Sequence, residues 1–205
     1  AALPLCPPMN RRATAKRLGI VLLIFLALTC ALACVIYVGT CRRNTQSVFT
    51  SREDLRLSIR REIELYDSVC SSLFGDPIGS WDVSAITDMR NLFVHTSFNQ
   101  DISAWNVSAV TDMSGMFESA DSFNQDISAW NVSAVTDMSG MFAFADSFNQ
   151  DISAWNVSAV TRMSFMFLFT HAFDKILCSD AWRASKSKAS QFDMFSGTNG
   201  AGICE

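Results

Sequence analysis

Cysteine, histidine and the acidic residues are the side chains of this chain that could perform chemistry or bind a metal. The 205 residues include seven Cys, twenty Asp and Glu, and two His, His95 and His171. The two His are far apart in the sequence, and the chain contains no C-x-x-C pair, no G-x-S-x-G motif and no phosphate-binding glycine loop. The sequence therefore predicts a protein that is not an enzyme, with no catalytic, cofactor-binding or metal-binding residues.

Cys178 and Cys204 bracket the last part of the chain. In an oxidising compartment we expect them to form a disulfide that secures the end of the fold. Zinc binding is the alternative for the cysteines, but the ligand spacing and the neighbouring His that such sites use are missing.

Three N-V-S sequons recur at equal spacing, at Asn106, Asn131 and Asn156. They are candidate glycosylation sites if the protein enters a eukaryotic secretory pathway. The equivalent residue of the preceding copy is Asp82, and Asn and Asp share the ability to accept a hydrogen bond from the backbone two residues on. The sequence leaves a glycan and a structural turn as alternatives.

Charge is distributed unevenly along the chain. Residues 1–43 contain six Lys and Arg and no acid, whereas residues 44–205 contain ten Lys and Arg against twenty Asp and Glu, a net charge of −10. This balance argues against nucleic-acid binding, which needs clustered cations. Acidic residues also recur at equal spacing in two series, which we call acidic columns. The first is Asp101, Asp126 and Asp151; the second is Asp88, Asp112 and Asp137, followed by Arg162. Either calcium binding or hydrogen bonding within turns would explain them.

A repeat of 25 residues dominates the sequence. Residues 101–125 return as 126–150 with two substitutions, and further copies are 151–175, a shorter 77–100 and a degraded 176–205. So short a unit cannot bury its own apolar side chains, so stacked copies must share one core. We expect a repeat solenoid, leucine-rich-repeat-like, in which each coil has a short strand near 101–105 and a short helix after Thr111. We expect the recurring Trp and Phe residues to lie between coils.

The run from Trp105 to Phe117, WNVSAVTDMSGMF, followed by SFNQDISAW, resembles the BspA-like surface-protein repeats. These are relatives of leucine-rich repeats found in bacterial and algal proteins and long catalogued as a domain of unknown function. The resemblance covers about residues 77–205. It implies a surface-exposed, non-catalytic solenoid, with adhesion or ligand binding in some members.

The N-terminal region carries a membrane signal. Residues 18–41 contain no charge and are long enough to span a bilayer as a helix. We interpret them as an uncleaved transmembrane signal anchor after a disordered cytosolic tail, residues 1–17; a cleaved signal peptide is the alternative. Residues 42–76 are expected to form a juxtamembrane amphipathic helix, running to about Phe74, that covers the open end of the solenoid 77–205.

These features together predict a single-pass membrane protein that presents a small repeat solenoid outside the cell for adhesion or recognition of a protein or glycan ligand. The alternative is a structural surface protein whose acidic columns are bridged by calcium. A third possibility, an enzyme acting on glycans through a carboxylate pair, is disfavoured because the repetition leaves no asymmetric site.

Overall fold

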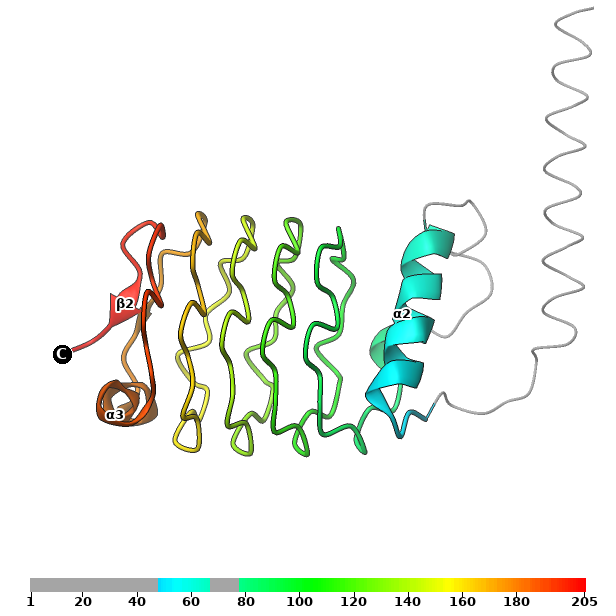
Figure 1. Ribbon diagram of the computed structural model, residues 1–205, viewed down its shortest axis with the longest axis horizontal. Helices are drawn as coiled ribbons and strands as arrows, with labels where there is room; N and C mark the ends of the chain where they lie inside the picture. The colour runs from blue at the N-terminus through cyan, green and yellow to red at the C-terminus, as the bar shows by residue number, and fades with distance from the viewer. Residues whose placement is uncertain (1–47, 67–77) are drawn as a thin grey trace, which may run out of the picture.

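The computed structural model describes residues 48–66 and 78–205, which form a row of stacked coils, one for each copy of the repeat (Figure 1). Helix α2 (Arg52–Tyr66) stands across the N-terminal end of the row, and the short 3-10 helix η2 (Ile78–Ser80) opens the first coil. The last coil contains strand β1 (Ile176–Leu177), helix α3 (Asp180–Lys188) and strand β2 (Gly202–Ile203), with β1 and β2 paired in parallel. The architecture is the predicted repeat solenoid.

Neighbouring coils are joined along one segment of each copy, which we call the turn run: residues 87–95, 111–119, 136–144, 161–169 and 189–197. In it, every second backbone N–H donates to a carbonyl of the next coil, as from Met113 to Asp137 and from Gly115 to Ser139 at 2.9 Å. Four such bonds form at each of the four junctions between coils. We call these bonds the inter-coil ladder.

The turn run replaces the short helix that the sequence led us to expect. An α-helix would use its N–H groups internally, whereas here alternate ones bond to the next coil. Of the others, that of Met116 donates to the carbonyl of Met113 three residues earlier, and that of Ser114 donates to the Asp112 carboxylate. Gly115 has a left-handed φ of 61°, which breaks any helix at that point. The strand expected near 101–105 is also wrong. That segment is a turn, and the parallel bridges between coils lie instead in the turn run, where Asp112 pairs with Asp88 and Asp137.

The interior consists of two parallel columns of stacked phenylalanine rings. One column has ring centroids 5.2–5.6 Å apart, the other 5.8–6.2 Å, and within a coil the two rings lie 3.9–4.2 Å apart. The first column is Phe93, Phe117, Phe142, Phe167 and Phe195; the second is Phe98, Phe123, Phe148 and Phe173. Offset stacking of this kind adds to the free energy gained by burying the rings. The prediction that these phenylalanines lie between coils is confirmed.

Each tryptophan after the first reaches back to the preceding coil. The buried indole Nε1 of Trp105 donates to the carbonyl of Ile78 at 2.8 Å, and that of Trp130 donates to Ile102 at 3.2 Å. Trp155 and Trp182 repeat the contact with Ile127 and Ile152. Each of these carbonyls also accepts a backbone N–H within its own coil, as Ile102 does from Trp105 at 3.1 Å. The indole bond therefore satisfies the buried Nε1–H and ties two neighbouring coils together.

Helix α2 closes the N-terminal end of the core. Ser51 is its N-cap, because the Ser51 hydroxyl accepts the backbone N–H of Asp54 at 3.2 Å and donates to the Asp54 carboxylate at 2.7 Å. Leu55 and Ile59 are fully buried in the solenoid core. The amphipathic helix is thus confirmed over its described part, and its predicted continuation to Phe74 lies outside the described residues.

The predicted cytosolic tail, residues 1–17, and the transmembrane signal anchor, residues 18–41, also lie outside the described residues. Within 48–66 and 78–205, no helix has the length and apolar composition needed to cross a bilayer.

We predict that Trp130→Phe lowers the free energy of unfolding by about 2 kcal/mol, because it removes the buried indole hydrogen bond to the Ile102 carbonyl and opens a small cavity. Urea denaturation measures the change. The control is Trp81→Phe, because the Trp81 indole makes no hydrogen bond within the described part of the chain. We expect this variant to lose less free energy of unfolding than Trp130→Phe. Equal losses in the two variants would show that the indole bond is not what stabilises the stack.

Candidate functional site

Four phenylalanines of the last three coils are exposed and form two pairs of contacting rings. Phe144, Phe165, Phe169 and Phe192 are 41, 38, 43 and 65% exposed. Phe144 stacks on Phe169 with ring centroids 5.6 Å apart, and Phe165 meets Phe192 edge to face at 5.4 Å. We call these four residues the aromatic patch. Large aromatic side chains gathered in water are typical of surfaces that bind a partner.

Three members of the aromatic patch also occupy an unfavourable backbone conformation. Phe144, Phe165 and Phe169 have left-handed φ values of 59°, 63° and 51°. In earlier coils the equivalent positions hold Asn91, Gly115 and Gly140 in one column and His95 and Ser119 in the other, also with left-handed φ. Small or polar residues tolerate this conformation, whereas a bulky side chain there costs of order 1 kcal/mol. The last coils therefore accept strain and, at the same time, expose apolar surface.

The sequence analysis missed the aromatic patch because it interpreted every recurring phenylalanine as core. The signal that could have revealed it is departure from the repeat. Phe144 replaces Ser119, and Phe165 replaces Gly140, in otherwise conserved copies. A residue that breaks the repeat has no obligatory place in the stacked core.

The first acidic column forms turns. The Asp101 carboxylate accepts the backbone N–H of Ser103 at 2.9 Å, and Asp126 and Asp151 do the same with Ser128 and Ser153. These hydrogen bonds hold the pKa of each carboxyl below its ordinary value. The column therefore has a structural role, the second of the two alternatives that the sequence left open.

The second acidic column is neutralised from both ends. Arg90 bonds Asp88 at 2.7 Å and lies 3.6 Å from Asp112, and at the other end Arg162 donates to Asp137 at 2.8 Å. Burial raises the pKa of Asp137, but the hydrogen bonds from Ser139 and the guanidinium of Arg162 outweigh it, so the pKa lies below its ordinary value. Arginines thus remove the repulsion expected between stacked carboxylates.

The sequon residues Asn106, Asn131 and Asn156 are exposed on successive coils. Their side-chain oxygens accept the backbone N–H two residues on, at 3.2 Å in each case. The amide nitrogens, to which a glycan would attach, make no hydrogen bond within the described chain. The turn is therefore present at all three sites, and glycosylation stays a prediction.

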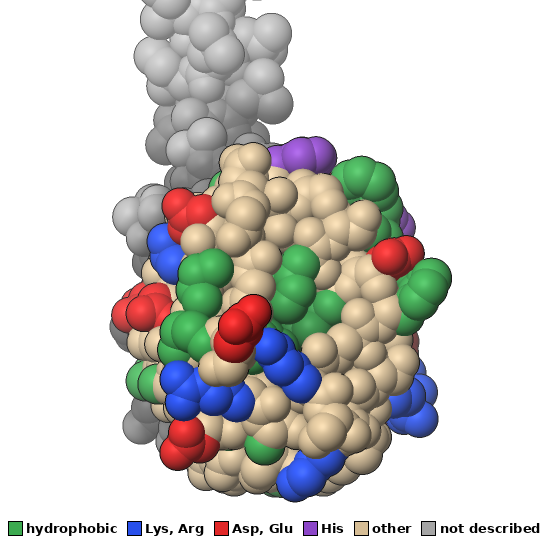
Figure 2. Space-filling model, turned by 90° about the vertical axis from the view of Figure 1, so that its left-hand side faces the viewer, with side chains coloured by type: hydrophobic (Ala, Val, Ile, Leu, Met, Phe, Trp, Pro, Cys, Tyr) green, Lys and Arg blue, Asp and Glu red, His purple; other side chains and the backbone are tan. Residues whose placement is uncertain are grey.

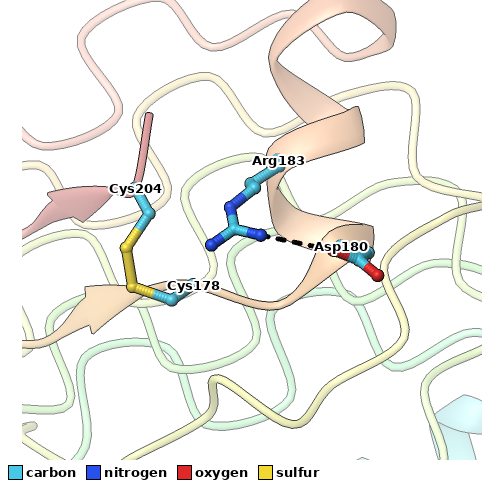
Figure 3. The surroundings of a disulfide bond; sticks show 4 residues. All are labelled: Cys178, Asp180, Arg183 and Cys204. Carbon is cyan, nitrogen blue, oxygen red and sulfur yellow. Dashed lines mark hydrogen bonds and ion pairs between the residues drawn. A yellow bond between two sulfur atoms is a disulfide. The ribbon is translucent and has the colours of Figure 1, made fainter.

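Cys178 and Cys204 are joined as a disulfide, with Cα atoms 4.9 Å apart (Figure 3). The bond links the chain just after β1 to the chain just after β2, the two strands that pair in the last coil. An ion pair between Arg183 and Asp180 at the start of α3 lies nearby. In the chain-entropy account, closing a loop of this length contributes roughly 3 kcal/mol. The disulfide therefore fixes the only coil that departs strongly from the repeat.

The two histidines lie in different coils. His95 is exposed in the first turn run, and His171 in the fourth coil has its Nδ1 2.7 Å from a carboxylate oxygen of Asp146. Within residues 48–66 and 78–205, no cluster of three or more His, Cys, Asp or Glu could hold a metal ion. The structure thus brings none of these titratable groups together around one centre in the part of the chain that it describes.

A family model described as "Mycoplasma protein of unknown function, DUF285" matches residues 64–182. The chain belongs to this family. The match begins near the end of α2 and ends within α3, so it covers the first four coils and leaves out most of the capping helix. Searches of curated proteins and of solved structures each found no match.

We predict that the DUF285 chain loses stability in acid. A carboxyl whose pKa is lower in the folded than in the unfolded state stabilises the fold above the unfolded pKa, about 3.9 for Asp, and this contribution disappears as the pH falls through the folded pKa. Asp137→Asn should therefore cost about 1 kcal/mol at pH 7, and the difference from wild type should close towards pH 2. Urea denaturation at several pH values measures it. Asp193→Asn, which removes a carboxylate that forms no ion pair in the described structure, should show no such convergence.

Calcium gives a separate test of the acidic columns. Because Ser and Arg donors already bind these carboxylates, we expect Ca²⁺ and Mg²⁺ to give the same unfolding temperature. Differential scanning calorimetry of the full chain with each cation measures this. A rise with Ca²⁺ alone would favour the alternative function, a structural protein bridged by calcium.

Proposed function

We propose that this DUF285 protein is a membrane-anchored, non-catalytic recognition protein that presents its solenoid at the cell surface for adhesion. The observation that carries the proposal is the aromatic patch: four exposed phenylalanines in the last three coils, three of them in left-handed backbone. Because these rings are exposed to water in the free protein, burying them against a partner would contribute favourable hydrophobic free energy to binding.

The placement of the patch supports a role in binding. A solenoid exposes one stripe of equivalent positions along its length, and such stripes are where repeat proteins contact partners. In this chain the equivalent positions are small or polar in the first two coils. Phe144 occupies one of them in the third coil, and Phe165 and Phe169 occupy both in the fourth. The core columns do not need these rings, because each of the first four coils already contributes its own buried pair.

The cell-surface part of the proposal depends on sequence features. The uncharged run 18–41 with basic residues before it is typical of a signal anchor that leaves the following region outside. The disulfide between Cys178 and Cys204 fits an oxidising compartment. The resemblance to BspA-like surface repeats points to the same location, with a protein or glycan as the ligand.

Protease accessibility tests the location. Cells that express the full chain are treated with a protease, and the C-terminal coils are detected with an antibody. We expect digestion in intact cells. Protection in intact cells and digestion only after lysis would place the solenoid on the inner side and overturn this part of the proposal.

Substitution of the aromatic patch tests recognition. In Phe144→Ser, Phe165→Gly and Phe169→Ser, each residue takes the type found in an equivalent coil, so the backbone strain is relieved and the stability should be unchanged or higher by up to about 1 kcal/mol. We expect the triple variant to bind at least tenfold more weakly than wild type to the ligands that the full chain selects from peptide and glycan arrays.

The control is Ile176→Ser, which removes an exposed apolar side chain, 51% exposed, outside the patch. It should leave array binding unchanged. Wild-type binding in the triple variant, or no ligand for the full chain on either array, would contradict the recognition role.

A further inference from the structure

The inter-coil ladder ends at the last coil with donors that have no acceptor. In the fourth coil, the N–H groups of Met163, Phe165, Phe167 and Phe169 bond to carbonyls of the fifth coil at 2.7–2.9 Å. In the fifth coil, the residues at the same positions are Gln191, Asp193, Phe195 and Gly197. Their N–H groups make no hydrogen bond within the described chain. We call these four donors the terminal edge.

The terminal edge is accessible. Asp193 and Gly197 are exposed, and Gln191 and Phe195 are half-buried. The remainder of the last coil does not cover it, since β2 pairs with β1, and Asn199 bonds to the carbonyl of Phe173. Figure 2 shows this end of the molecule with hydrophobic side chains open to solvent beside charged ones. A row of unpaired backbone groups at an accessible edge is a template for pairing with another chain.

A second copy of this chain does not fit the edge. Tail-to-tail association would place donors opposite donors, which cannot bond. Head-to-tail association would require the opposite end of the stack, where Leu55 and Ile59 of α2 are packed into the core. The edge therefore requires an occupant that offers acceptors and is not another solenoid of this type.

The chemistry of the edge specifies that occupant. Four donors on alternate residues match the carbonyls of a polypeptide that follows the path of a turn run, since each turn run inside the stack offers four alternate carbonyls to the preceding coil. Beside them, Phe195 ends a stacked column, 5.5 Å from Phe167, and can accept one further ring. The exposed Phe192, from the aromatic patch, lies next to the donor of Asp193 in sequence and adds apolar surface for a partner side chain.

We propose that the terminal edge binds a segment of a partner polypeptide, which takes the conformation of a turn run and adds to the solenoid as a further rung of the inter-coil ladder. This inference rests on the proposed recognition function and names the partner class, a polypeptide. The segment spans about seven residues, so that four alternate carbonyls meet the four donors, and it carries an aromatic side chain that continues the Phe195 column.

A peptide with the sequence of residues 136–144, TDMSGMFAF, is a suitable probe, because within the solenoid this segment supplies carbonyls to the preceding coil in the same way. With the full chain in detergent, we expect the peptide to slow amide hydrogen exchange at the terminal edge at least tenfold. Exchange at Met163 and Phe165, already bonded to the last coil, should be slow with and without it. A scrambled peptide of the same composition is the control.

A matched pair of variants tests the donors themselves. Gln191→Pro removes one N–H, and Gln191→Ala keeps it while losing the same side-chain bond to Ser185, so the two differ in the donor. By fluorescence anisotropy of the labelled peptide, we expect Gln191→Pro to bind at least tenfold more weakly than Gln191→Ala. Slow exchange at Met163 in both variants shows that the last coil has remained folded.

The outcomes separate this inference from the proposed function. Equal binding of the two Gln191 variants, or no exchange protection at the edge in wild type, overturns edge binding. Edge binding is also overturned if the full chain binds only glycans on the arrays and this binding depends on the aromatic patch but not on Gln191. That result would still support the recognition function. Protection of the solenoid from protease in intact cells contradicts the surface function while leaving edge binding intact.

Discussion

The fold depends on sharing backbone hydrogen bonds between coils. No coil has enough internal partners for its own N–H groups, because half of those in the turn run point to the next copy. A buried donor without an acceptor costs as much as a lost hydrogen bond. The coils are therefore stable only as a stack, and both ends of the stack pose a problem that the repeat itself cannot solve.

The two ends of the stack differ in whether the outermost coil is covered. At the N-terminal end, Leu55 and Ile59 of α2 cover the core, and the backbone of Phe49 pairs with Asp82 of the first coil. At the C-terminal end, α3 and the disulfide between Cys178 and Cys204 fix the last coil without covering its turn run. The asymmetry gives the molecule one closed end and one end with free donors, and the exposed aromatic residues lie towards the free end.

Equivalent side chains of neighbouring coils lie next to one another, so their interaction either stabilises or destabilises the stack. Phenylalanine rings with centroids 5.2–6.2 Å apart stabilise the stack, since each ring buries the next. Carboxylates repel one another, and here Ser donors and the Arg90 and Arg162 guanidinium groups remove the conflict. The Asn column shows a third solution. The side-chain oxygen of Asn99 accepts the backbone N–H of Asn124 and the side-chain amide of Gln125 in the next coil, so the bonds across coils do not join two Asn side-chain amides.

The 25-residue period by itself determined that the chain is a solenoid and which recurring Trp and Phe residues are buried, because periodicity specifies which side chains must share a core. A separate pattern, the helical spacing of apolar residues in 42–76, predicted the amphipathic capping helix. The path of the backbone within a coil was decided by tertiary structure. Gly115 and Ser119 adopt left-handed φ, and the N–H groups pair across coils, because hydrogen bonds to a neighbour 25 residues away outweigh the local helical preference of residues 111–120. The terminal edge likewise appears only in three dimensions, since it depends on how the last coil faces solvent, which a linear pattern does not contain. Departures from the repeat mark Phe144 and Phe165 in the sequence, but only the tertiary structure shows that their rings are exposed and stacked.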